Sequence, residues 1–264
     1  MAKLPKAYKF IDFSDYGRKP GRLIAKSFQN TSVTPIHVTS MFVLAGLGAI
    51  LCILNGYYFA GGLLLILKSA LDAADGELSR LKKTPSHTGR YYDSISDIIL
   101  NFLFLLTFWK VTDGSIIYTL LAFIGLQLQG TVYNFYYVIL RNNANGDTTS
   151  RIFENEAPTA LKGEKQNTVN FVYTLYTILY SIFDKTIYAL DASAATCAPF
   201  PKWFMSMVSI FGLGFQLLIM SFLLMINQVE YIIPFFIGYS VFILVFIAIR
   251  KVLFKSSALE NSLN

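Results

Sequence analysis

Long apolar runs, separated by short polar segments, make up most of this 264-residue chain. A helix needs about 20 predominantly apolar residues to cross a lipid bilayer. The pattern predicts six such helices, over residues 37–58, 59–81, 94–109, 115–140, 203–226 and 231–249. We therefore expect an all-α integral membrane protein that crosses the membrane several times.

Two further segments are apolar but interrupted by charge. Residues 1–30 mix aromatic and aliphatic side chains with Lys and Arg, which favours an amphipathic segment on the membrane surface. The remaining residues, 31–264, would form one six-span domain. Residues 167–190 are long enough to span the membrane, but they contain Asp184, and a seventh span would place Lys251 outside. We predict that this segment forms an interfacial helix.

Residues 71–98 are the one strongly charged cluster among these apolar runs, and four aspartates recur in it at regular spacing. In a helix, residues three, four, seven and eight positions apart share a face. That spacing places five residues on one face of a first helix, namely Asp72, Asp75, Gly76, Ser79 and Arg80. It places three residues on one face of a second helix, namely Gly89, Asp93 and Asp97. Residues 81–88 are predicted to join the two helices, because Pro85 breaks a helix and Ser86 or Thr88 can cap the next one.

Charge and composition agree with a membrane protein and indicate its orientation. Apolar residues make up 54% of the chain and charged residues only 14%. Lys and Arg concentrate on the cytoplasmic side of membrane proteins. With the N-terminus inside, the outer loops hold only Lys110, so the acidic hairpin end faces the cytoplasm. The membrane would be the inner membrane of a bacterium or the endoplasmic reticulum of a eukaryote. This topology accounts for the net charge of +6, and no motif suggests a nucleic-acid partner.

Four carboxylates at the membrane need compensating charge. Each unpaired carboxylate at the bilayer centre costs roughly 3 kcal/mol on insertion scales. The nearby Lys and Arg are not expected to neutralise all four, because several of them must point into the cytoplasm. Oxygen ligands without His or Cys favour Mg²⁺ or Mn²⁺, with Ca²⁺ as a further option. Hard cations on carboxylates commonly bind a diphosphate and stabilise a leaving phosphate, and a remaining carboxylate can accept a proton from an alcohol. Gly76 would let a nucleotide lie close to the helix. The residues indicate phosphoryl-group transfer.

The same residues resemble a family signature. The pattern D-x-x-D-G-x-x-A-R, eight residues, then G-x-x-x-D-x-x-x-D is typical of the CDP-alcohol phosphotransferases, also called CDP-alcohol phosphatidyltransferases. The chain departs from it at Ser79, where the family usually has Ala. It matches the pattern at seven positions: Asp72, Asp75, Gly76, Arg80, Gly89, Asp93 and Asp97.

The resemblance implies a helical membrane enzyme of phospholipid biosynthesis that breaks the diphosphate of a CDP-linked donor, releases CMP and joins the phospho-group to an alcohol. It implies that Asp72, Asp75 and Asp93 hold two Mg²⁺ or Mn²⁺ ions, while Asp97 shares in metal binding and acts as the catalytic base. Around the CDP moiety, the resemblance implies contacts from Gly76, Ser79, Arg80 and Gly89. Family members commonly form homodimers.

The substrates and one rival function remain open. The donor is either CDP-diacylglycerol, with a polar alcohol as acceptor, or CDP-choline or CDP-ethanolamine, with diacylglycerol. Lys68, Arg90 and Arg141 could contact a substrate phosphate, although Lys68 could instead pair with Asp72 one turn away. Six tyrosines could surround a choline group: Tyr133, Tyr136, Tyr137, Tyr173, Tyr176 and Tyr180. The rival function is a divalent cation transporter using intramembrane carboxylates, which the clustering of the acidic residues at one hairpin end disfavours.

Overall fold

The computed structural model describes residues 4–144, 156–196 and 200–253, and these residues form helices without any strand. The α-helices are α1 (Arg18–Phe28), α2 (Pro35–Leu54), α3 (Tyr58–Lys82), α4 (His87–Thr112), α5 (Ile116–Asn143), α6 (Gln166–Asp191), α7 (Lys202–Val208), α8 (Leu213–Met225), α9 (Ile232–Tyr239) and α10 (Val241–Leu253). Short 3-10 helices lie at Lys6–Tyr8, Phe13–Asp15, Ala192–Thr196, Ser209–Phe211 and Val229–Tyr231. The predicted all-α class is confirmed.

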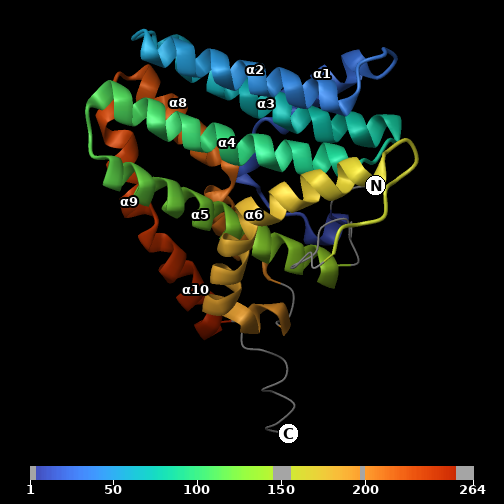
Figure 1. Cartoon of the computed structure of the whole chain (residues 1–264). Coiled ribbons are helices and arrows are strands. Elements are labelled where there is room, and N and C mark those ends of the chain that lie inside the picture. Colours follow the sequence, from blue (N-terminus) through green and yellow to red (C-terminus); the bar gives the residue numbers. More distant parts are fainter. Residues whose placement is uncertain (1–3, 145–155, 197–199, 254–264) are drawn as a thin grey trace, which may run out of the picture.

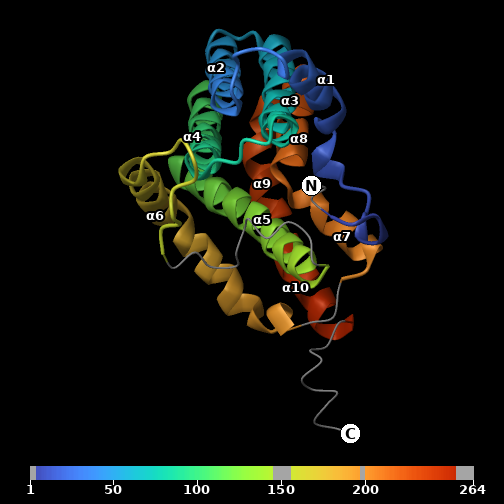
Figure 2. The same ribbon diagram turned by 90° about the vertical axis from the view of Figure 1, so that its right-hand side faces the viewer.

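Helices α2, α3 and α4 run alongside one another, and α1 lies against α3 (Figure 1). Figure 2 shows α3 beside α2 and α4 below α2, with α8 next to α3. The described parts of α3 and α4 both pack on α2 rather than closely on each other. A first hydrophobic cluster fills this region and includes Phe42, Leu65 and Phe104. This arrangement leaves the facing sides of α3 and α4 free to carry polar groups.

A second hydrophobic cluster lies among α5, α7 and α10 and includes Phe204, Phe211 and Phe246. In Figure 1, α10 continues from α9 down the lower part of the molecule. Helix α6 ends close to the end of α10. The predicted helix over residues 167–190 is confirmed as α6, whereas its interfacial position stays a prediction.

The hairpin between α3 and α4 is shorter than the sequence suggested. Helix α3 continues to Lys82 and ends at Lys83 in the left-handed conformation, and α4 begins at His87. The predicted joint over residues 81–88 is therefore wrong by two residues at each end. Its physical basis holds, because the Ser86 side chain caps α4 by accepting the Gly89 N–H.

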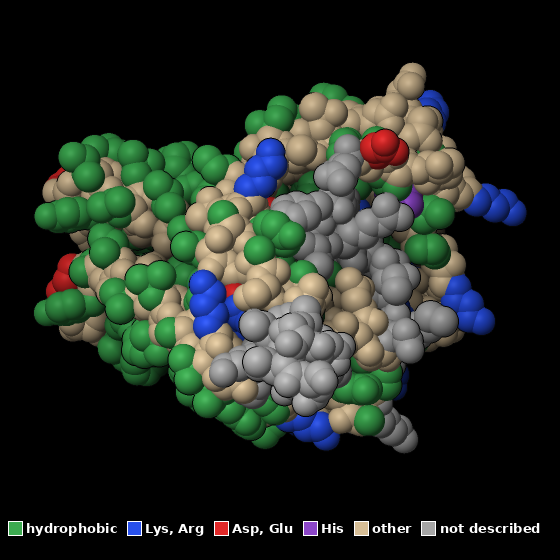
Figure 3. Space-filling model, turned by 90° about the horizontal axis from the view of Figure 1, so that it is seen from below, with side chains coloured by type: hydrophobic (Ala, Val, Ile, Leu, Met, Phe, Trp, Pro, Cys, Tyr) green, Lys and Arg blue, Asp and Glu red, His purple; other side chains and the backbone are tan. Residues whose placement is uncertain are grey.

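Several helices are apolar enough for a membrane. Among the described residues, α2, α4, α5 and the segment Val229–Leu253 are long and apolar enough to cross it, and α7 with α8 is a fifth candidate bent by 52° at Gly212. The predicted count of six is not confirmed, because α3 carries several charged residues and is not among these candidates. Hydrophobic side chains dominate the left part of the face in Figure 3, whereas Lys and Arg lie at its middle and right.

The N-terminal segment packs on the helices that form the site. A Cβ added to Gly17 would lie 2.7 Å from Ser69 O, so α1 and α3 approach with their backbones nearly in contact. The Phe13 N–H bonds Ser209 Oγ at 2.9 Å. On the outer side, Leu23 is 71% exposed, as expected for an amphipathic helix. The assignment of residues 1–30 to a membrane surface stays a prediction.

Candidate active site

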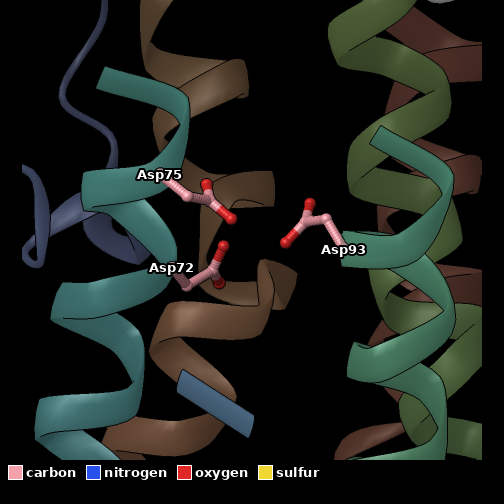
Figure 4. Close-up of side chains that lie close together, drawn as sticks. All are labelled: Asp72, Asp75 and Asp93. Carbon is pink, nitrogen blue, oxygen red and sulfur yellow. The ribbon is translucent and has the colours of Figure 1, made fainter. Parts of the chain in front are cut away.

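Three of the four motif carboxylates converge between α3 and α4. Asp72 and Asp75 lie one turn apart on α3 and point toward Asp93 on α4 (Figure 4). One carboxylate oxygen from each lies within 4.8 Å of the others. The spacing explains this, because residues three apart share a helix face, and the short hairpin brings the second acidic face opposite the first.

The partners of these carboxylates leave room for a cation. Asp75 is 8% exposed and accepts a 2.6 Å hydrogen bond from Thr39 Oγ1 on α2. Asp93 Oδ1 is buried and accepts no hydrogen bond from any described residue. A buried polar atom without a partner is costly, and a bound cation would offset that cost. Oxygen ligands that converge in this way fit Mg²⁺ or Mn²⁺.

The fourth carboxylate, Asp97, is engaged differently. Its Oδ1 accepts a short hydrogen bond from Lys68 Nζ, and it is not one of the three residues whose oxygens converge. Lys68 is fully buried, lies over the Phe42 ring and is 3.6 Å from Asp72 Oδ2. The ion pair between Lys68 and Asp72 that the sequence suggested is therefore present, and Lys68 links the triad to Asp97.

Gly76 follows Asp75 on α3, and the Arg80 guanidinium lies one turn further along, beside it. A Cβ at Gly76 would meet no described atom nearer than the Arg80 guanidinium, at 3.6 Å, so protein packing does not require glycine here. Arg80 also pairs with Glu77 at 3.2 Å and lines a cavity of about 360 Å³ between α3 and the N-terminal segment. An open glycine beside a cationic side chain fits close approach of a phosphate-bearing ligand.

The other two expected CDP contacts serve the hairpin. Ser79 Oγ donates to Thr84 O at 3.1 Å, so the hydroxyl that replaces the family's alanine is used to hold the turn. The Gly89 N–H is bonded to Ser86 Oγ at 2.8 Å. A Cβ at Gly89 would lie 3.2 Å from that oxygen, which would crowd the cap.

Arg90 and Arg141, suggested as acceptor contacts, each lie against a tyrosine ring, and their role toward an acceptor stays a prediction. The Arg90 guanidinium lies 4.5 Å from the centre of the Tyr91 ring, and the buried Arg141 lies 5.8 Å from the Tyr137 ring. The six candidate tyrosines divide among separate contacts. Tyr176 stacks on Tyr180 beside α4, Tyr133 lies against Tyr137, and Tyr136 bonds Asp191.

Three residues support the site through contacts that the sequence did not indicate, although it had suggested Tyr180 as a possible choline contact. Thr39 bonds Asp75, Tyr180 donates to Ser94 O at 2.7 Å, and Glu164 accepts hydrogen bonds from the first turn of α4. Thr39 is one hydroxyl in an apolar span, and the other two are distant from the motif in the chain. No local pattern marks them.

The fold and the site define an all-helical membrane protein with a carboxylate centre between two antiparallel helices. The family model of the CDP-alcohol phosphatidyltransferases matches residues 32–239, most of the chain and the whole motif. The chain therefore belongs to the CDP-alcohol phosphatidyltransferase family, which supports transfer of a phospholipid head group. No curated protein and no solved structure matches the chain.

Proposed function

We propose that this protein breaks the diphosphate of a CDP-linked donor, transfers the phospho-group to an alcohol and releases CMP. The observation that carries the proposal is the convergence of Asp72, Asp75 and Asp93, next to Gly76 on α3. The family match supports this chemistry over cation transport.

Each side chain of the site has a role in this proposal. Asp72, Asp75 and Asp93 would hold Mg²⁺ or Mn²⁺. The bound ions would neutralise the diphosphate and stabilise the leaving phosphate. Gly76 leaves space for the donor along α3, and Arg80 supplies a positive charge at its edge.

Asp97 is the proposed base. It lies one helical turn beyond Asp93 on α4, and Lys68 fixes its carboxylate by a hydrogen bond. A carboxylate that is oriented but outside the converging triad can accept the proton of the acceptor hydroxyl. Lys68 is thereby a positioning residue rather than a contact to a substrate phosphate.

The membrane topology of the proposal has six crossings. Helix α3 packs along α2 and joins α4 through a short hairpin, so it would return the chain across the membrane between these two candidate spans. With α3 and the bent pair α7 and α8 counted as crossings, the predicted six are reached. The distribution of Lys and Arg supports a cytoplasmic site.

The first test is CMP release by the purified protein with Mg²⁺ or Mn²⁺. CDP-diacylglycerol with a panel of alcohols is compared with CDP-choline and CDP-ethanolamine with diacylglycerol, each with and without a chelator. Chelator-sensitive CMP release from one donor type would establish the activity and choose between the two substrate classes. Absence of CMP from every donor, with folded protein and metal present, would overturn the proposal.

The role of Asp97 is tested by Asp97→Asn. We expect turnover to fall by about 10²- to 10⁴-fold, the usual contribution of a positioned acid or base, with donor and metal binding largely kept. Asp113→Asn is the matched control, because Asp113 lies at the other end of the same helix. Turnover of Asp97→Asn within a few fold of the wild type would exclude Asp97 as the base.

A further inference from the structure

The first turn of α4 lacks local compensation for its helix dipole. Helix N-termini leave backbone N–H groups without helical partners and attract negative charge. No acidic residue occurs in the first turn of α4. Ser86 satisfies the Gly89 N–H, but the Thr88 N–H needs another acceptor.

Glu164, from the segment that leads into α6, supplies that acceptor. Its Oε1 accepts the Thr88 N–H at 2.7 Å and the Ser86 hydroxyl at 2.8 Å. Its Oε2 accepts the Leu161 N–H at 3.0 Å. Since Ser86 donates to Glu164 and accepts from Gly89, the three residues form a continuous hydrogen-bond chain into the helix.

The segment that carries Glu164 is itself braced. The Gln166 side chain accepts the Ala160 N–H at 2.8 Å and donates to Pro158 O at 3.0 Å. Further along, Tyr180 on α6 donates to Ser94 O on α4 at 2.7 Å. Helix α6 is thus fastened to α4 at two levels, and the Glu164 contact is the level at the end of α4 where the site opens.

We propose that Glu164 is a positioning residue of the active site, which fixes the first turn of α4 and so holds Asp93 against the carboxylates of α3. Asp93 lies one turn after Gly89, so movement of the first turn displaces its carboxylate. Helix α2 and the short hairpin hold α3 and α4 together, and the Glu164 contact adds a fixed point at the first turn of α4, where α3 itself packs little on α4. The inference rests on the proposed metal-dependent function.

The contact is formed throughout the physiological pH range. Burial would raise the pKa of Glu164, but the hydrogen bonds from Thr88, Ser86 and Leu161 outweigh it and lower the pKa to about 2. The unfolded chain has a Glu pKa of about 4.3. The stabilisation by Glu164 is therefore present above pH 4.3 or so and is lost as the pH falls through about 2. A change between pH 6 and 8 should not release it.

The test compares Glu164→Gln with the wild type in the full-length protein in detergent. The unfolding temperature is measured during titration with Mn²⁺ alone, with no donor present. Glu164→Gln removes the negative charge at the helix N-terminus and the second acceptor oxygen. We expect this to lower the population of the binding-competent site, so that the Mn²⁺ concentration for half of the thermal shift rises about five- to tenfold. With donor, KM should rise more than kcat falls.

Glu156→Gln is the matched control, since Glu156 is exposed in the same segment, and it should titrate like the wild type. An unchanged Mn²⁺ midpoint in folded Glu164→Gln would overturn the proposal. If that variant does not fold, Glu164→Asp is measured instead, because the shorter side chain cannot reach the Thr88 and Leu161 N–H groups together. A wild-type Mn²⁺ midpoint in Glu164→Asp would also overturn the proposal. If Mn²⁺ stabilises the wild type but no CMP is released, the proposed function is wrong. The Mn²⁺ midpoints of the variants would still test the role of Glu164.

Discussion

Two groups of buried carboxylates lie in this protein, and they are balanced in opposite ways. Asp191, at the end of α6, accepts hydrogen bonds from Arg250 Nε at 2.8 Å and from the Tyr136 hydroxyl at 2.7 Å. Both Asp191 and Arg250 are 1% exposed. The chain itself therefore supplies the cation and the donors that this carboxylate needs.

The motif carboxylates are not balanced in this way. Among the described residues, Lys68 is the one cationic side chain that pairs with any of the four, and it contacts Asp72 and Asp97. Asp93 Oδ1 is buried without a hydrogen-bond donor. Burial is therefore common to both places, whereas a buried carboxylate oxygen without a hydrogen-bond donor occurs at Asp93 and not at Asp191.

Asp93→Asn is expected to have the largest effect, because it tests directly whether the unpartnered carboxylate binds a metal. If the triad holds the metal, we expect CMP release to fall by about a thousandfold, because metal stabilisation of the transition state is worth several kcal/mol. Stability should not fall, since one of several neighbouring negative charges is removed. CMP assays and thermal unfolding measure the two effects. Full activity in this variant would show that Asp93 is not a ligand.

Asp191→Asn should lower stability and leave activity nearly unchanged, the reverse of Asp93→Asn. Removing one partner of a buried ion pair typically costs about 3 kcal/mol or more, so unfolding should occur at a lower temperature. CMP release measured well below that temperature should stay close to the wild type. Combining Asp191→Asn with Arg250→Met should recover part of the stability, because no charge is then left unpaired. Loss of activity in the folded single variant would instead couple this network to catalysis.

The site could be predicted from sequence because its geometry is local. Asp72 and Asp75 share a face through helical periodicity, and the pairing of Lys68 with Asp72 follows from a four-residue spacing. Pro85 and the Ser86 cap predict the hairpin that places Asp93 opposite Asp72 and Asp75. Local rules of this kind give the motif, the all-helical class and most helix positions.

The features that the sequence did not predict depend on contacts between segments that are distant in the chain. Asp191 and Arg250 lie 59 residues apart, and Glu164 and Thr88 lie 76 apart, so no local pattern joins them. The predicted fifth span also gave no sign of its 52° bend at Gly212, where the backbone leaves the helical conformation and Ser14 of the N-terminal segment packs closely. Such features arise from packing, which periodicity does not encode.

The smallest expected effect is the gain in stability on metal binding, which should differ between the two carboxylate sites. Metal binding to the folded state alone should stabilise the wild type by about 2.7 kcal/mol when free Mg²⁺ or Mn²⁺ is a hundred times its Kd. Asp191→Asn starts from a lower unfolding temperature but should show the same gain, because its carboxylate belongs to a closed network. Asp93→Asn should show little gain, and thermal unfolding with and without a chelator measures each. Equal gains in all three proteins would mean that the ion binds elsewhere, and the unpaired Asp93 oxygen would then need another explanation.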